Sequence, residues 1–156
     1  MPIKKILWPT DFSHGCDLVL PYVCSLAQKY GAGLELLYVA DDLSDYREWY
    51  GELTDEHAQR LRDWEVEHAK EKLEQVCETG LAACPILEKK VVLGDPALEI
   101  LKVAEQGGAD MIIMASRGRG AEKHGTETFG SVAEKVVKGA KVPVTIVNPS
   151  AVEEIT

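Results

Sequence analysis

The sequence has no apolar run long enough to cross a membrane, and no N-terminal segment with the apolar stretch of a signal peptide. Basic residues are outnumbered, because 17 Lys and Arg stand against 26 Asp and Glu, for a formal net charge of −9. A field of this sign repels nucleic acid and anionic lipid surfaces. We therefore expect a soluble, cytoplasmic protein that binds neither nucleic acid nor a membrane.

Cysteine is scarce, and its spacing gives no sign of metal chemistry. The sequence contains Cys16, Cys24, Cys77 and Cys84, with no Cys-x-x-Cys pair and no zinc-ligand pattern. We interpret them as reduced thiols that mostly pack in the interior. The sequence therefore predicts no protein-bound metal.

Two common phosphate-binding motifs are also missing. The pattern G-x-x-x-x-G-K-[ST] occurs nowhere in the chain. The loop after the first apolar run, with the sequence PTDFS, lacks the glycines of a dinucleotide-binding fingerprint. These absences argue against a P-loop NTPase and against a dinucleotide-dependent dehydrogenase.

What the sequence does contain is an alternation of apolar runs with helical patterns. Strands are expected at residues 4–9, 34–40, 86–94, 109–116 and 142–147, and helices at residues 17–31, 54–77, 96–108 and 131–140. Such alternation predicts a parallel sheet with helices on both faces, formed by one domain over residues 1–156. We expect residues 41–55, the glycine-rich loop and the tail 150–156 to lack regular structure.

A candidate site lies beyond the carboxyl ends of these strands, where open parallel sheets bind ligands. Asp11 follows the first strand, and Ser131 and Glu134 have the spacing of a capping box at a helix start. The loop after residues 109–116 carries Arg117, Gly118, Gly120 and Gly130. Glycines let backbone amides approach an anion, so this arrangement suits a ribose with phosphates. The alternative is a solvated connection without a ligand.

Four segments taken together give the chain a family resemblance. In order, they are KKILWPTDFS, VVLGDPALEIL, ADMIIMASRGRG and GSVAEKVVKGAKVPVTIV. From Lys4 to Asn148 the chain resembles the universal stress proteins. The resemblance implies a Rossmann-like α/β fold with a five-stranded parallel sheet of order 3-2-1-4-5 and helices on both faces. It also implies a homodimer through the C-terminal strand Val142–Val147 and an unidentified regulatory protein partner.

Many universal stress proteins bind ATP through the motif G-x-x-G-x9-G-[ST] after the fourth strand. The matching positions here are Gly118, Gly130 and Ser131. Ala115 stands at the first glycine, and two more residues than the motif expects separate Gly118 from Gly130. Counting from Gly120 restores the spacing but puts Arg117 at the first glycine. The resemblance thus implies binding of ATP, ADP or AMP, with or without Mg²⁺. The departures from the motif predict weaker binding or a changed ligand, because a looser loop costs more entropy to order.

The resemblance implies further contacts with a nucleotide. Asp11, preceded by Pro9 and Thr10, matches the acidic residue near the nucleotide, Val39 matches the strand end near the base, and Gly94 lies in a loop beside the site. Each has a purely structural alternative. Asp11 would cap the first helix, Val39 would pack in the core and Gly94 would serve a turn.

Three functions remain open at this point. The first is a nucleotide-binding regulatory protein of the stress response, with at most slow ATP hydrolysis. The second is a dimeric interaction module of the same fold without nucleotide, and the third is a cleft enzyme for acyl or phosphoryl transfer. Asp11, His14 and Cys16 would suit a thiol nucleophile or a metal site, but neighbours in one loop seldom converge on one point. No catalytic residue is predicted.

Overall fold

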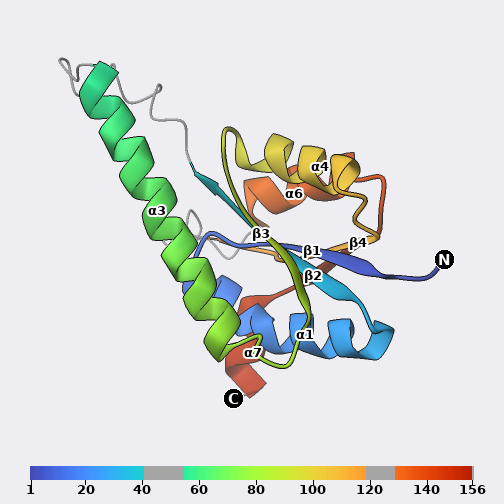
Figure 1. Ribbon diagram of the computed structural model, residues 1–156. Helices are drawn as coiled ribbons and strands as arrows, with labels where there is room; N and C mark the ends of the chain where they lie inside the picture. Colours follow the sequence, from blue (N-terminus) through green and yellow to red (C-terminus); the bar gives the residue numbers. More distant parts are fainter. Residues whose placement is uncertain (41–54, 119–128, 156) are drawn as a thin grey trace.

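The computed structural model describes residues 1–40, 55–118 and 129–155, in which a parallel sheet is covered by helices on both faces (Figure 1). The strands are β1 (Lys5–Pro9), β2 (Gly33–Ala40), β3 (Ile86–Leu93), β4 (Met111–Ala115) and β5 (Val144–Val147). The helices are α1 (His14–Tyr30), α3 (Asp55–Thr79), α4 (Pro96–Gln106), α6 (Ser131–Gly139) and α7 (Pro149–Ile155). The five strands run in the order β3-β2-β1-β4-β5, every pairing is parallel, and the predicted fold class is confirmed.

Two hydrophobic clusters fill the space between the sheet and its helices. On one face, Trp8 of β1 and Val23 of α1 belong to a cluster that also takes in Leu73 of α3. On the other face, Ile100 of α4 and Val136 of α6 pack on the opposite side chains of the strands. Because strand residues alternate between faces, the central strands are apolar on both. No helix within the described residues is both long and apolar enough to span a membrane.

Helix α1 begins three residues earlier than the apolar period predicts. Ser13 is its N-cap, and the Ser13 side chain accepts a hydrogen bond from the amide of Cys16 at 3.3 Å. Gly31 ends the helix in the left-handed conformation, with φ of 63°. The cap fixes where the β1–α1 loop ends and the helix begins.

The C-terminal tail is helical, which corrects the expectation that residues 150–156 lack regular structure. Helix α7 packs against α1, and its first residue, Pro149, lies 3.2 Å from where a Cβ on Gly15 would stand. The Asn148 side chain accepts a hydrogen bond from the amide of Ser150 at 3.1 Å. An Asn cap followed by proline at the first helical position is a standard helix start, and it is short enough to be overlooked. The expectations for residues 41–54 and 119–128 lie outside the described residues.

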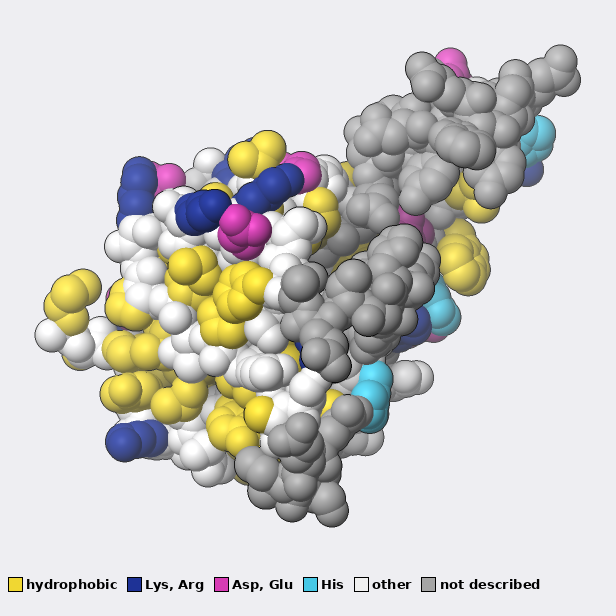
Figure 2. All heavy atoms as spheres, turned by 180° about the vertical axis from the view of Figure 1, so that it is seen from behind, with side chains coloured by type: hydrophobic (Ala, Val, Ile, Leu, Met, Phe, Trp, Pro, Cys, Tyr) yellow, Lys and Arg dark blue, Asp and Glu magenta, His cyan; other side chains and the backbone are white. Residues whose placement is uncertain are grey.

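Strand β5 is one edge of the sheet, and its four residues are all partly exposed. Strand β3, the other edge, is nearest the viewer in Figure 1, so Figure 2 looks from the side of β5. Hydrophobic side chains gather on the face that Figure 2 shows. The homodimer expected through Val142–Val147 falls on this edge and stays a prediction.

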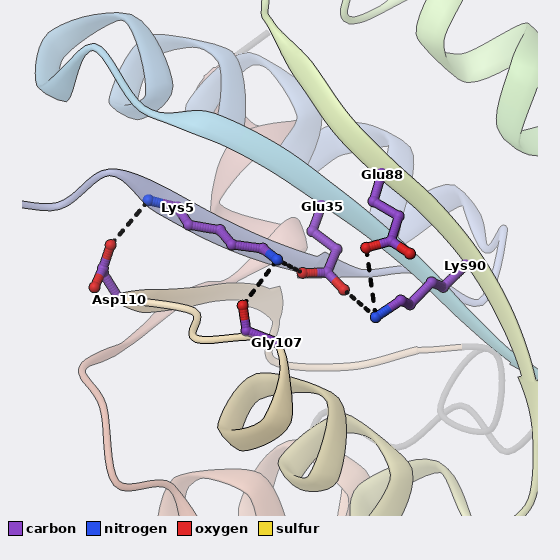
Figure 3. A network of polar contacts seen from close by, with 6 residues as sticks. All are labelled: Lys5, Glu35, Glu88, Lys90, Gly107 and Asp110. Atoms are coloured by element: carbon purple, nitrogen blue, oxygen red, sulfur yellow. Dashed lines mark hydrogen bonds and ion pairs between the residues drawn. The ribbon is translucent and has the colours of Figure 1, made fainter.

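A buried carboxylate on β2 joins β1, β2 and β3 in the amino-terminal half of the sheet (Figure 3). Glu35 of β2 is fully buried, and its Oε2 lies 2.6 Å from Nζ of Lys5 in β1. Its Oε1 lies 3.1 Å from Nζ of Lys90 in β3, and hydrogen bonding to Glu35 raises the pKa of Lys90. Lys5 also donates to the carbonyl of Gly107 at 2.9 Å, where α4 ends. Each lysine thus holds β2 to a neighbouring strand.

Candidate functional site

Three segments that are distant in sequence meet at the carboxyl ends of β1 and β4. Gly118 lies so close to Asp11 that a Cβ on Gly118 would overlap Oδ2 of the carboxylate. Gly130 lies against the same segment, because its amide donates to the carbonyl of Ser116 at 2.7 Å. Strand β1 is the point at which the strand order reverses, since β2 lies on one side of it and β4 on the other. The structure therefore brings the predicted loops together at the position where open α/β sheets bind ligands.

The β1–α1 turn is held by its own side chains. Oδ1 of Asp11 accepts from the amide of Ser13 at 2.9 Å, and Oγ1 of Thr10 accepts from the amide of Phe12 at 3.0 Å. Thr10 and Ser13 are both buried. Such side-chain to backbone bonds are typical of rigid turns that present a polar group. Asp11 therefore helps to shape the turn, while the helix itself is capped by Ser13.

Phe12 carries backbone strain within this turn. Its φ is 60°, the left-handed region that a bulky side chain rarely adopts. The Phe12 ring packs 4.8 Å from the ring of Tyr38, and Nζ of Lys72 lies 5.2 Å from its centroid. Strained conformations persist where the surroundings enforce them, and they cluster at binding sites. The strained backbone of Phe12 therefore supports a functional role for this turn, in addition to its position beside Gly118.

The start of α6 supplies backbone donors opposite the Asp11 turn. The N-cap is Gly130, which has no side chain to accept from the amides of the first helical turn. Ser131 is the first helical residue, and Glu134 binds Lys138 at 2.6 Å, which lowers the pKa of Glu134. The predicted helix start is confirmed, but the capping box is wrong because Ser131 lies one residue too far into the helix. Uncapped amides and the positive end of the helix dipole attract an anion.

Cys16 is not an activated nucleophile. Its Sγ lies 3.2 Å from Oδ1 of Asp11, and burial together with the charge of Asp11 raises its pKa to about 12. At neutral pH it is therefore a thiol, whereas nucleophilic catalysis needs the thiolate. His14 is the first residue of α1 and is exposed. Among the described residues, no three His, Cys, Asp or Glu side chains are grouped so that they could hold a metal ion.

Other predicted site residues lie elsewhere along the carboxyl ends of the strands. Pro9 ends β1, and Val39 and Gly94 stand at the ends of β2 and β3, on the side of β1 away from β4. Gly94 has φ of 147°, and its amide donates to the carbonyl of Ala40 at 3.1 Å, which continues the pairing of β3 with β2. Ala115 ends β4 and is buried in the α1-side cluster. Gly120 lies outside the described residues.

Two residues of the site were missed by the sequence reasoning. Ser13 is the helix cap, and Ser116 is buried, with its amide donating to Val147 at 2.9 Å and its carbonyl accepting from Gly130. A Ser shortly before the acidic Asp17 is a recognisable helix-start signal. The role of Ser116 depends on its backbone, and no side-chain pattern predicts it.

A parallel sheet with this strand order and with loops that meet at the reversal defines a Rossmann-like α/β protein. Residues 2–148 match the sequence profile of the universal stress protein family. A universal stress protein of Methanocaldococcus jannaschii is 32% identical over 154 residues, covering 92% of this chain and 94% of that protein. The chain belongs to the universal stress protein family.

Solved structures agree with this assignment. The universal stress protein UspA of Lactobacillus plantarum has a TM-score of 0.78 at 25% identity, covering 95% of this chain and 99% of the other. A universal stress protein of Archaeoglobus fulgidus, solved in complex with dAMP, has a TM-score of 0.64 at 20% identity. That likeness covers 95% of this chain and all of the other, and it shows a shared fold.

Proposed function

We propose that this protein binds an adenine nucleotide where the Asp11 turn, the segment Ser116–Gly118 and the start of α6 at Gly130 meet, and that it acts as a nucleotide-dependent regulator of a stress response. The observation that carries the proposal is the contact of Gly118 with Asp11. It puts the Asp11 carboxylate directly beside the backbone that follows β4. The dAMP complex of a protein with the same fold supports an adenine nucleotide as the ligand.

The groups at this junction would bind different parts of a nucleotide. The carboxylate of Asp11 accepts hydrogen bonds, so it suits the ribose hydroxyls. The amides that follow Gly130 are donors at the positive end of a helix, and they suit the phosphates. Arg117 adds positive charge between the two, in a chain whose net charge is −9. With this distribution of charge, a bound nucleotide would have its ribose toward β1 and its phosphates toward α6.

Glycine at position 118 is explained by this arrangement. Any side chain there would collide with the Asp11 carboxylate, which already lies where a Cβ would stand. Between Gly118 and Gly130 the sequence has two more residues than the family motif expects. Ordering extra residues costs conformational entropy, so we propose weaker binding than the unaltered family motif gives.

Isothermal titration calorimetry with ATP, ADP and AMP, each with and without Mg²⁺, tests the proposal. We expect a dissociation constant of about 1 mM or tighter for at least one of them. Asp11→Asn keeps an oxygen that accepts from the amide of Ser13, so the turn survives while the charge is lost. This variant should bind at least about tenfold more weakly, since a hydrogen bond to a charged group is worth about 1.5 to 3 kcal/mol.

Glu105→Gln is the control, because Glu105 is exposed near the far end of α4 and binds only the exposed Lys141 among the described residues. It should bind nucleotide as the wild type does. Dissociation constants weaker than millimolar for all three nucleotides would contradict the proposal. Equal affinity of Asp11→Asn and wild type would move the site away from the β1–α1 turn.

A second candidate function is an interaction module of the same fold that binds no nucleotide. The observation in its favour is the edge strand β5, whose four residues are all partly exposed, on the side where Figure 2 shows hydrophobic side chains. An edge strand of this kind suits pairing with a second copy of the chain. The calorimetry separates the two candidates, because only the first requires a nucleotide.

A further inference from the structure

Two cysteines that are far apart in sequence are in direct contact. Sγ of Cys24 and Sγ of Cys84 are 2.7 Å apart, although 60 positions separate the residues in the chain. Unbonded carbon atoms prefer about 3.5 to 4.0 Å, and sulfur is larger. A disulfide bond measures about 2.05 Å, so the pair needs only a small further approach to bond.

Both cysteines stand on well-anchored backbone. Cys24 lies on α1 next to Val23, which is fully buried in the core. The amide of Cys84 donates to the carbonyl of Leu81 at 3.0 Å, and the next residue, Pro85, accepts from the amide of Leu34 at 2.8 Å. The contact is therefore set by the core and by the start of the sheet, and thermal motion of a loose loop is not needed to bring the sulfurs together.

A neighbouring contact repeats the same packing. A Cβ on Gly80 would lie 3.0 Å from the Leu20 side chain, one helical turn before Cys24. Helix α1 thus meets the connection between α3 and β3 at two successive turns. The Cys24–Cys84 pair belongs to this interface, on the α1 face of the sheet. The pair lies away from the candidate nucleotide site, because Cys84 precedes the amino-terminal end of β3, whereas that site lies at the carboxyl ends of β1 and β4.

We propose that Cys24 and Cys84 form a reversible disulfide when a hydroperoxide oxidises the folded protein. Cys24 reacts first because it is partly exposed, whereas Cys84 is buried. Its thiolate attacks the peroxide O–O bond, which gives a sulfenic acid and releases an alcohol, or water if the oxidant is hydrogen peroxide. The sulfur of Cys84 then attacks the sulfenic sulfur and its proton leaves with the hydroxide as water. The two thiols lose two electrons and two protons, and the peroxide is reduced.

The order in which Cys24 and Cys84 react agrees with the chemistry of each thiol. Burial, assisted by the contact with Cys24, raises the pKa of Cys84 to about 12. Cys84 is therefore a poor first nucleophile toward a peroxide in solution. It is nevertheless held in contact with Cys24, so it needs no diffusion to resolve the sulfenic acid. Cys16 binds Asp11 at 3.2 Å and has no comparable thiol neighbour among the described residues.

The test is peptide mapping of the full-length protein after treatment with hydrogen peroxide, followed by alkylation of the remaining thiols in denaturant. We expect the mass to fall by two hydrogen atoms, and one cross-linked peptide that joins Cys24 to Cys84. Cys24→Ser and Cys84→Ser should each abolish this cross-link, while the matched control Cys77→Ser keeps it. Dithiothreitol should reverse the modification.

Thermal unfolding gives an independent readout. The cross-link closes a loop of about 60 residues in the unfolded chain, so oxidation should raise the unfolding midpoint by roughly 8 to 15 °C. The shift should be absent in both serine variants and present in Cys77→Ser. Full alkylation of all cysteines after peroxide treatment, a different pairing, a cross-link between two chains, or an unchanged midpoint would each overturn the proposal.

Discussion

Gly130→Val is expected to lower the affinity for the adenine nucleotide at least about 100-fold, a loss of about 2.7 kcal/mol. A Cβ at this position would lie 3.0 Å from the carbonyl oxygen of Ser116 and 3.4 Å from Cα of Arg117, and both neighbours are backbone atoms. Valine adds two further methyl groups, so the segment Ser116–Gly118 has to move away from α6. The amides of α6 and the carboxylate of Asp11 then no longer face one ligand. Calorimetry on the variant measures the loss.

The same substitution at the other end of the helix is the matched control. Gly139 ends α6, and a Cβ there would meet only the flexible end of the Leu101 side chain closely, at 2.7 Å. Gly139→Val should therefore change stability modestly, by about 1 to 3 kcal/mol, and leave nucleotide affinity unaltered. If Gly130→Val binds as tightly as Gly139→Val, the junction of Ser116 with α6 is not part of the site.

Glu35→Ala is expected to lower the free energy of unfolding by about 2 to 3 kcal/mol. Glu35 is fully buried and binds Lys5 at 2.6 Å and Lys90 at 3.1 Å, so its removal takes a buried carboxylate from two ammonium groups (Figure 3). The ammonium group of Lys5 then keeps only the carbonyl of Gly107, and that of Lys90 keeps Glu88 at 3.5 Å, among the described residues. Both lysines keep some contact with water, so the loss is at or below the lower end of the roughly 3 to 5 kcal/mol that breaking a buried ion pair costs. Urea unfolding followed by circular dichroism measures the effect.

An exposed ion pair provides the comparison for Glu35. Glu105 binds Lys141 at 2.6 Å, but both side chains are more than half exposed, so Glu105→Ala should cost less than about 0.5 kcal/mol. The ion pair with Glu35 raises the pKa of Lys90. This ion pair therefore stabilises the folded state fully below the ordinary lysine pKa of 10.5, and its contribution is lost as pH rises through the raised value. Equal losses for Glu35→Ala and Glu105→Ala would contradict a stabilising role of the buried cluster.

Much of the fold follows from local patterns. The apolar run at β2 is buried on both faces and the intervening helices have apolar stripes, so alternation alone predicts a parallel sheet. Helix ends are less predictable, because a single cap moves them. Ser13 starts α1 earlier than its apolar stripe indicates, and Asn148 with Pro149 starts α7 where a tail without regular structure is expected. Both signals are one or two residues long and compete with many similar dipeptides in loops.

The candidate site is only partly predictable for a different reason. Asp11 and Gly118 follow the carboxyl ends of β1 and β4, and their proximity follows once these two strands are neighbours in the sheet. Which residue caps α6 depends on backbone geometry at Gly130, where the spacing of Ser131 and Glu134 suggests another answer. Long-range pairs are harder still. Glu35 with Lys90, and Cys24 with Cys84, come from elements that only the folded sheet brings together.

Backbone amide chemical shifts of the ¹⁵N-labelled protein, recorded during titration with whichever of ATP, ADP and AMP binds most tightly in calorimetry, test the central claim most directly. If Asp11, Ser116–Gly118 and the start of α6 form one nucleotide site, the largest shifts should occur at residues 10–13, 116–118 and 130–133. The amides around Glu35 and Gly107, at the amino-terminal ends of the strands, should stay unchanged. Shifts confined to another surface, or none with the nucleotide at about 10 mM, well above the expected dissociation constant, would contradict the account.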